Sequence, residues 1–327
     1  MNIVAAIIGM GIGQKHFEAI EGYKNSKVKI ICEKDKKKIK LLKKKYPNKI
    51  ITQNENDIYL DKNINLVSIA SYDEYHFKQI IKCFKFKKNF IVEKPMCMNE
   101  NQLKIIKNYI DKYPEIKMTS NLVLRVNSLF NNFKKNLSKD KIFYIEGDYI
   151  WGRKHKLFGW RSLTKEFSLI KGAGIHLIDL IMWLTNMKPH SVYTLGNKNS
   201  TKGTIFKKES FIVMLFKFPK NIIVKITANG GAIYDHFHEL KIFSSNQTMV
   251  NSRLGVFSQN SKSFKKESFL YPDKKNRKKL IHNFLDCIID KKTKPLIKFK
   301  EMTDALSVCF AAENSLKQKK EIKIKYI

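Results

Sequence analysis

The sequence predicts an α/β fold, in which a doubly wound parallel sheet is followed by an α+β domain with an open, mostly antiparallel sheet. Up to residue 120, segments rich in β-branched residues, which we expect to be strands, alternate with segments of helical pattern, and this alternation is typical of a parallel sheet. Beyond residue 120, strand-like segments follow one another with few helices between them, which favours antiparallel pairing. We therefore expect two domains, at residues 1–120 and 121–327.

The elements can be placed in chain order. In the first domain, strands are expected at residues 4–8, 27–32, 66–70, 90–92 and 116–119, and helices at 14–23, 35–45, 76–85 and 100–112. In the second, strands are expected at 142–151, 210–218, 221–228 and 239–243, and helices at 174–184, 279–290 and 303–318. Two polar segments, 196–208 and 261–279, are expected to be surface loops.

The composition excludes several classes of protein. The net charge of +34 invites a nucleic-acid interpretation, but only five of the 63 basic residues are arginine, the residue that base and phosphate recognition favour. No apolar run approaches the ~18 residues of a membrane span, and the N-terminus shows no leader. The five cysteines are scattered without a C-x-x-C pair, so we expect cytoplasmic thiols and no metal site.

A glycine-rich turn joins the first strand to the first helix, where the strand at 4–8 runs into Gly9, Gly11 and Gly13. Glycine is needed where a backbone turns tightly and comes close to a pyrophosphate. The following helix directs its N–H groups and positive dipole end at the phosphates. Glycine clusters also occur in ordinary turns, but the flanking strand and helix favour a dinucleotide site.

Glu33 follows the second strand, at the spacing of about 20 residues that such sites show. A carboxylate there accepts hydrogen bonds from an adenosine ribose and repels a 2′-phosphate, so Glu33 favours NAD over NADP. Lys34 and the lysines at 36–38 would accommodate a phosphate, which keeps NADP as the alternative cofactor. A solvated loop acid is the other interpretation of Glu33.

Glu93, Lys94 and Pro95 follow the strand at 90–92, at the sheet edge where open α/β sheets bind ligands. A lysine there can hydrogen-bond a substrate oxygen and exchange its proton as hydride moves, and burial or a nearby cation would lower its pKa toward the working range. A cis bond before Pro95 would fix the direction of the lysine. A surface lysine in a turn is the alternative.

Small residues at 172–174 lead into a helix that carries His176 and Asp179. The two side chains are one helical turn apart, so they can project from the same face. We expect the imidazole to lie at the helix N-terminus, where the dipole keeps it neutral and able to accept a proton. The alternative is a polar helix start that serves only packing.

Together the three motifs resemble the Gfo/Idh/MocA family of NAD(P)-dependent sugar oxidoreductases, and the resemblance runs nearly end to end. In the cofactor half it is carried by the glycine turn with His16, by His76, and by Glu93, Lys94 and Pro95. In the second half it is carried by Gly159, Trp160 and Arg161, by Gly174, His176 and Asp179, and by the accompanying Arg125, Ala312 and Ser315.

The resemblance implies a Rossmann domain and a second domain whose open sheet forms homodimers or homotetramers. It implies hydride transfer between nicotinamide and a hydroxyl or carbonyl carbon of a sugar or nucleotide sugar, with surface-glycan biosynthesis as one setting. Lys94 would exchange the proton, and His176 would position the substrate and share that proton. The implied cofactor contacts are Gly9, Gly11, Ile12, Gly13, Glu33, Ser71, His76, Glu93, Lys94, Trp160 and Arg161. The implied substrate contacts are Lys94, Arg125, Arg153, His176 and Asp179.

Two departures from the family pattern matter. The glycine loop is one residue shorter than in many members, and Gly172 stands where many family dehydrogenases carry an aspartate beside the lysine and histidine. The missing carboxylate leaves a second hypothesis, a cofactor-binding sensor with weakened turnover. A lysine-rich nucleic-acid binder is the third.

The scarce arginines are less subject to composition bias than the lysines. Arg125, Arg153 and Arg161 are therefore candidates for holding a phosphate or carboxylate of the substrate.

Overall fold

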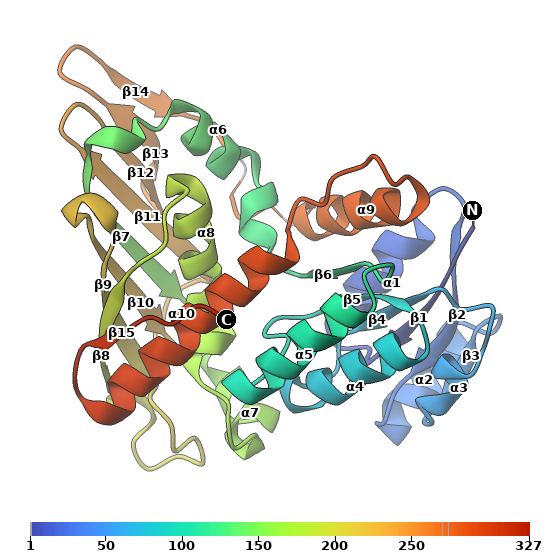
Figure 1. The fold of residues 1–327 in the computed structure, drawn as a ribbon. Helices are drawn as coiled ribbons and strands as arrows, with labels where there is room; N and C mark the ends of the chain where they lie inside the picture. Colours follow the sequence, from blue (N-terminus) through green and yellow to red (C-terminus); the bar gives the residue numbers. More distant parts are fainter. Residues whose placement is uncertain (1, 270, 274) are drawn as a thin grey trace. The chain divides into compact units, whose positions relative to one another are not determined.

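The computed structural model describes residues 2–269, 271–273 and 275–327 and divides into two compact units (Figure 1). Unit 1 consists of residues 1–126 and 274–300, and unit 2 of residues 127–273 and 301–327. The division expected at residue 120 differs from these units in residues 121–126, which belong to unit 1, and in the segment 274–300, which returns to unit 1. The reason is apolar packing, because Ile281, Phe284 and Leu285 are buried in the same core cluster as the first strand.

Unit 1 is built on a six-stranded parallel sheet with strand order β3-β2-β1-β4-β5-β6. The strands are β1 (Ile3–Ile8), β2 (Ser26–Cys32), β3 (Ile50–Thr52), β4 (Leu66–Ile69), β5 (Asn89–Val92) and β6 (Met118–Ser120). The helices are α1 (Gly13–Glu21), α2 (Lys36–Lys45), α3 (Asn56–Tyr59), α4 (Asp73–Lys85), α5 (Glu100–Lys112) and α9 (Asn276–Ile289). The strand order reverses between β1 and β4, which is the switch point where such sheets bind ligands.

Unit 2 is built on a nine-stranded sheet with strand order β14-β13-β12-β11-β7-β10-β9-β8-β15. Only the β7–β10 pair is parallel among the described strands of this sheet. The strands are β7 (Ile142–Ile150), β8 (Ser191–Asn197), β9 (Phe211–Lys217), β10 (Ile223–Asn229), β11 (Phe237–Ser244), β12 (Thr248–Ser252), β13 (Gly255–Gln259), β14 (Phe264–Glu267) and β15 (Ile322–Lys323). The helices are α6 (Ser128–Asn136), α7 (Trp160–Leu163), α8 (Ile175–Thr185) and α10 (Phe299–Gln318).

Helix α8 packs on one face of the unit 2 sheet. A Cβ at Gly147 of β7 would lie 3.4 Å from Leu177 and 3.5 Å from Ile181, so the helix meets the strand closely. The opposite face is open, since large apolar side chains such as Phe143, Leu195 and Ile223 remain half exposed. The predicted α/β class and open, mostly antiparallel second sheet are therefore confirmed.

Several short elements escaped the sequence prediction. They are β3, α3, α6, α7, β8 and β12 to β15, and the predicted loops at 196–208 and 261–279 overlap β8, β14 and α9. The expectation of loops there is wrong in part, because β14 is an exposed edge strand in which three of the four residues are charged, so its sequence resembles that of a loop. Partner strands, not local sequence, hold such a segment extended.

Two further sequence expectations concern membranes and thiols. No helix in the described part of the chain is long and apolar enough to cross a bilayer. All five cysteines are buried thiols. Among residues 2–269, 271–273 and 275–327, no group of three or more His, Cys, Asp or Glu side chains is arranged so that it could hold a metal ion.

Candidate functional site

The glycine turn of unit 1 leaves space for a ligand on one side and none on the other. Gly9 has φ +85°, and a Cβ there would lie 2.7 Å from the Ala70 carbonyl oxygen. A Cβ at Gly13 would lie 3.0 Å from Ile7, so this glycine lets α1 approach β1. Nothing lies within 4 Å of a Cβ at Gly11, so the middle of the turn faces open space. Backbone strain and packing fix the outer glycines, and the middle one is open to a phosphate.

Helix α1 begins at Gly13 without a side-chain cap and without an acidic residue in its first turn. Its first N–H groups therefore meet no competing carboxylate, and they suit the phosphates of a dinucleotide. Ile12 precedes the helix, and Ser71 lies against the turn, where its Cα would be 2.9 Å from a Cβ at Gly9. The residues present thus fit a pyrophosphate.

Glu33 lies at the end of β2, beside the same turn. Its Oε2 accepts a hydrogen bond from the Met10 backbone N–H at 3.0 Å, and its Oε1 accepts one from the Lys34 N–H at 2.9 Å. The carboxylate is thereby fixed next to the glycine backbone, where a ribose would lie. Lys38 Nζ lies 3.9 Å from Oε2. Lys38, whose charge could accommodate the 2′-phosphate of NADP, therefore lies close to Glu33.

Lys94 follows β5 at the carboxyl edge of the parallel sheet, and its peptide bond to Pro95 is cis, as predicted. His76 is fully buried behind this turn, with Nδ1 2.7 Å from the Pro95 carbonyl oxygen and Nε2 3.2 Å from that of Ser71. This geometry makes His76 a support of the turns that carry Lys94 and Ser71, and the direct cofactor contact that the resemblance implies stays a prediction.

Glu93 is the centre of a buried polar network in unit 1. Its Oε1 lies 3.1 Å from His16 Nε2 and accepts a hydrogen bond from Asn121 Nδ2 at 2.5 Å. Arg277 Nε of α9 is 3.7 Å from the same oxygen, and His16 Nδ1 is 2.8 Å from Ser68 Oγ. Burial alone raises the pKa of Glu93, but the His16 hydrogen bond and the Arg277 charge hold that pKa well below its usual range.

The Glu93 network was not anticipated by sequence reasoning, which assigned Glu93 to the cofactor. The buried ionised carboxylate connects α1, β5, the end of β6 and α9, and its contact with the cofactor stays a prediction. We interpret Glu93 as the group that fixes the backbone on which Lys94 stands.

His176 does not lie at a helix N-terminus, and this expectation is wrong. A π-helical turn, Ile170–Gly174, runs directly into α8, and Leu169 before it already has helical dihedral angles. The free N–H groups of the helix therefore lie about two turns before His176, and the dipole acts weakly on the imidazole. His176 and Asp179 are both buried on α8, three residues apart as predicted.

An aromatic and histidine cluster surrounds His176 in unit 2. The ring of Tyr149 stacks on His176 at 5.9 Å and packs against His236 at 5.3 Å and His238 at 4.8 Å. The Tyr271 hydroxyl lies 2.6 Å from His238 Nδ1. We call these five residues the histidine cluster.

Burial determines the protonation of the histidine cluster. Burial and the charge of Arg153 lower the pKa of His236 to about 4, and burial holds the pKa of His238 well below its usual value. Burial also raises the pKa of Tyr149 to about 12, against the charges of Arg153 and Arg161. The cluster is therefore uncharged near pH 7 at these three residues, and it offers hydrogen-bonding groups that suit neutral hydroxyls.

Tyr149, His236, His238 and Tyr271 were missed by sequence reasoning. Three different segments of chain carry them, and no spacing rule joins those segments. The one local signal is the alternation of His236 and His238 at the start of a strand.

Gly172 lies in the π-helical turn, and an aromatic ring occupies the space where a side chain would be. A Cβ at Gly172 would lie 2.9 Å from Cε2 and 3.0 Å from Cζ of Phe167. Phe167 in turn packs edge-on against Trp160 at 6.0 Å and Phe206 at 6.1 Å. The wall of unit 2 at this point is therefore apolar.

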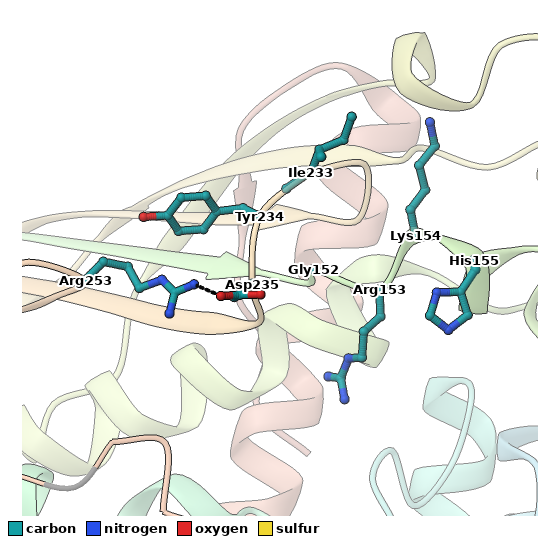
Figure 2. A pocket seen from close by; sticks show the side chains of 9 residues that line it. Gly152, Arg153, Lys154, His155, Ile233, Tyr234, Asp235 and Arg253 are labelled. Carbon is teal, nitrogen blue, oxygen red and sulfur yellow. Dashed lines mark hydrogen bonds and ion pairs between the residues drawn. The ribbon is translucent and has the colours of Figure 1, made fainter.

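The three candidate arginines do not share one unit. Arg125 is buried in unit 1, on a one-turn helix at Val123–Val126. Arg153 and Arg161 are in unit 2, and the guanidinium of Arg161 lies 4.3 Å from the centre of the Trp160 ring. Arg153 follows β7, in the segment that lines an open hollow of about 560 Å³ with residues 232–235 and Arg253 (Figure 2).

Two family profiles match the chain. Residues 3–120 match an oxidoreductase family with an NAD-binding Rossmann fold, and residues 140–250 match the Gfo/Idh/MocA C-terminal domain. The chain belongs to the Gfo/Idh/MocA family. As a member, it is an oxidoreductase, and its N-terminal domain is an NAD-binding Rossmann domain.

Solved structures of this fold cover nearly the whole chain. Myo-inositol 2-dehydrogenase from Lactobacillus plantarum is 20% identical, with 99% of this chain and 100% of that chain covered and a TM-score of 0.85. Scyllo-inositol dehydrogenase from Lactobacillus casei, solved with NAD(H) and scyllo-inositol, is 15% identical, with 99% of each chain covered and a TM-score of 0.83. An Agrobacterium radiobacter oxidoreductase in complex with NAD⁺, L-tartaric acid and magnesium is 13% identical, covers 99% and 98%, and has a TM-score of 0.85. No curated protein sequence matches the chain.

Proposed function

We propose that this Gfo/Idh/MocA member is an NAD-dependent dehydrogenase of a sugar or nucleotide sugar, acting on a CH–OH group or the matching carbonyl. The observation that carries the proposal is the position of Lys94. It stands at the carboxyl edge of the same parallel sheet whose glycine turn fits a pyrophosphate, on a backbone fixed by buried Glu93. The similar structures include two inositol dehydrogenases, which supports a polyhydroxylated substrate.

NAD would supply the hydride acceptor. The proton of the reacting hydroxyl would pass to the Lys94 amine as the carbon is oxidised, and it would return from the ammonium in the reverse direction. His176 would hold the substrate hydroxyl and share this proton, and Asp179 would orient His176 or bind a second hydroxyl. Around His176, the neutral histidine cluster would offer hydrogen bonds to the remaining hydroxyls.

The cofactor would be held by the glycine turn, by Glu33 at the ribose and by Ser71. Trp160 and Arg161 remain proposed contacts, and Arg125 remains a proposed substrate contact. NADP stays the alternative cofactor because Lys38 lies near Glu33. Turnover of a nucleotide sugar would place the enzyme in surface-glycan biosynthesis.

Assembly and location are part of the same proposal. The open face of the unit 2 sheet exposes Phe143, Leu195, Leu215 and Ile223, and covering this face in a homodimer or homotetramer would bury them. The five buried thiols suit the cytoplasm. Neither a specific nucleic acid nor a membrane is proposed as a partner.

The second candidate is a cofactor-binding sensor with weakened turnover. One observation favours it, the Phe167 ring that lies where a carboxylate side chain at position 172 would begin. Without that carboxylate, Lys94 and His176 would have to suffice for proton transfer.

The test is a titration with NADH and with NADPH, followed by nicotinamide fluorescence, on the unaltered protein and on Lys94→Ala. We expect NADH to bind more tightly than NADPH, because Glu33 repels a 2′-phosphate, and binding to survive in the variant. In a screen of polyols, sugars and nucleotide sugars, Lys94→Ala should lower kcat by about 10²–10⁴-fold. Failure of both nucleotides to bind would overturn the proposal, and tight NADH binding without any turnover would favour the sensor.

A further inference from the structure

Two cations, Arg153 and Lys156, follow the carboxyl end of β7 and are called the pair here. Gly152 follows the strand with φ +60°, and a Cβ there would overlap the Tyr234 carbonyl oxygen, so the chain turns at this glycine. Figure 2 shows that Arg153 and Lys154, directly after the turn, point in opposite directions. The guanidinium of Arg153 lies 6.0 Å from the centre of the Trp151 ring.

The pair carries positive charge that nothing nearby neutralises. Among the described residues, neither Arg153 nor Lys156 forms an ion pair with a carboxylate, and Asp235, which lines the same hollow, is paired with Arg253 at 2.6 Å. Burial and the charges of Arg153 and Arg161 lower the pKa of Lys156. Positions 153 and 156 lie one turn apart, because the Lys156 N–H donates a hydrogen bond to the Arg153 carbonyl oxygen at 2.9 Å across the one-turn helix Lys154–Leu157. Two cations one turn apart without a carboxylate partner favour the binding of an anion.

Ring contacts link the segment that carries the pair to the groups that would face the substrate. Trp151 packs against Tyr149 at 6.0 Å, and Tyr149 stacks on His176. The charge of Arg153 acts on Tyr149, His236 and His238 alike. An anion at Arg153 would therefore be part of a molecule whose hydroxyls reach the histidine cluster.

We propose that Arg153 and Lys156 form a subsite for an anionic group on the substrate, a carboxylate or a phosphate. This inference rests on the proposed function, and it adds an anion-binding group to the neutral sugar site proposed there. A guanidinium binds either group through two parallel hydrogen bonds, and Lys156 adds a point charge. The substrate class is then an acidic sugar, a sugar phosphate or a nucleotide sugar.

The subsite is tested by binding, without turnover. Glucose, glucuronate, glucose 6-phosphate, UDP-glucose and inorganic phosphate are each titrated while tryptophan fluorescence is followed, since Trp151 lies beside the subsite. At least one anionic sugar should bind about 10–100-fold more tightly than glucose, the gain expected of one charge-assisted contact. Arg153→Met should remove this preference, and Lys156→Met should reduce it.

Two matched variants control for general charge. Arg253→Met removes an arginine of the same hollow that is already paired, and Lys154→Met removes a lysine that points the other way (Figure 2). Both should keep the preference for the anion. Glucuronate, glucose 6-phosphate or UDP-glucose as the tightest ligand would identify a carboxylate, a monophosphate or a diphosphate, respectively.

Three results would overturn the subsite. They are glucose binding as tightly as every anion, no saturable binding of any anion, and an equal loss in Arg153→Met and Arg253→Met. The NADH titration on the same samples separates the two proposals. NADH binding without anion preference overturns the subsite alone, whereas anion preference without NADH binding overturns the dehydrogenase and leaves the subsite standing.

Discussion

The two units hold their candidate sites by different means. In unit 1, the glycine turn and the first N–H groups of α1 are backbone features, fixed by the φ of Gly9 and by packing of Gly13 on β1. In unit 2, the candidate site is made of side chains from β7, β11, α8 and the segment after β14, joined by ring contacts. A backbone site depends on local spacing, and a side-chain site depends on long-range packing. The cofactor site should therefore be sensitive to small changes at glycines, and the substrate site to changes in ring packing and charge.

The largest expected effect falls on the glycine turn. Gly9→Ala should abolish NADH binding, because a Cβ at φ +85° would lie 2.7 Å from the Ala70 carbonyl oxygen and displace the turn. Gly11→Ala should weaken NADH binding with little change in melting temperature, since nothing lies within 4 Å of that Cβ. Gly203→Ala is the control, with φ +78° but open surroundings. Equal NADH affinity in Gly9→Ala and the unaltered protein would contradict a backbone-made site.

Next in size is the loss of the buried carboxylate of unit 1. Glu93→Gln should destabilise unit 1 by about 3–5 kcal/mol, because Arg277 and His16 lose their buried partner. Glu18→Gln, at an exposed carboxylate paired with Lys15, should cost no more than ~0.5 kcal/mol. Denaturant unfolding of both variants measures the loss in the free energy of unfolding. Similar small losses of stability in the two variants would show that the Glu93 network contributes little to the stability of unit 1.

The two units should also respond differently to acid. The pKa of His236 is lowered from 6.5 to about 4 in the folded protein. Between pH 6.5 and pH 4 the unfolded chain therefore binds a proton that the folded chain does not, and unit 2 loses stability as the pH falls through this range. The pKa of Glu93 lies well below 4.5, so its contribution to unit 1 is present above pH 4.5 and is lost only below it.

Fluorescence separates these two responses, since Trp151, Trp160 and Trp183 all lie in unit 2. Between pH 6.5 and 4.5 the melting temperature followed by tryptophan should fall, and it should fall less in His236→Phe, which keeps the ring packing on Tyr149. An identical pH dependence in His236→Phe would contradict the assignment to this histidine.

The smallest expected effect concerns Gly172. Gly172→Asp should destabilise unit 2 by about 1–3 kcal/mol, because its Cβ would lie 2.9 Å from the Phe167 ring. Adding Phe167→Leu should recover part of this loss, and a double-mutant cycle with chemical unfolding measures the coupling. A gain in kcat from Gly172→Asp alone, with unchanged stability, would show that the ring yields readily and that the missing carboxylate limits turnover.

The sequence predicted most of unit 1 because its signals are local. Alternating strands and helices, the Gly9–Gly13 turn, Glu33 after β2 and the cis bond at Pro95 each depend on a few neighbouring residues, and the structure has all of them. The chain order of these motifs was enough to identify the family.

Tertiary structure alone decided the rest, since each remaining feature joins distant segments. Contacts across the chain brought Arg277 to Glu93, placed Phe167 over Gly172, and gathered Tyr149, His238 and Tyr271 around His176. The π-helical turn that moves His176 away from a helix N-terminus is likewise invisible in the small residues that form it. Side chains far apart in sequence meet only when the sheets and helices pack, and the physical reason is that burial, rather than local propensity, sets their positions and charges.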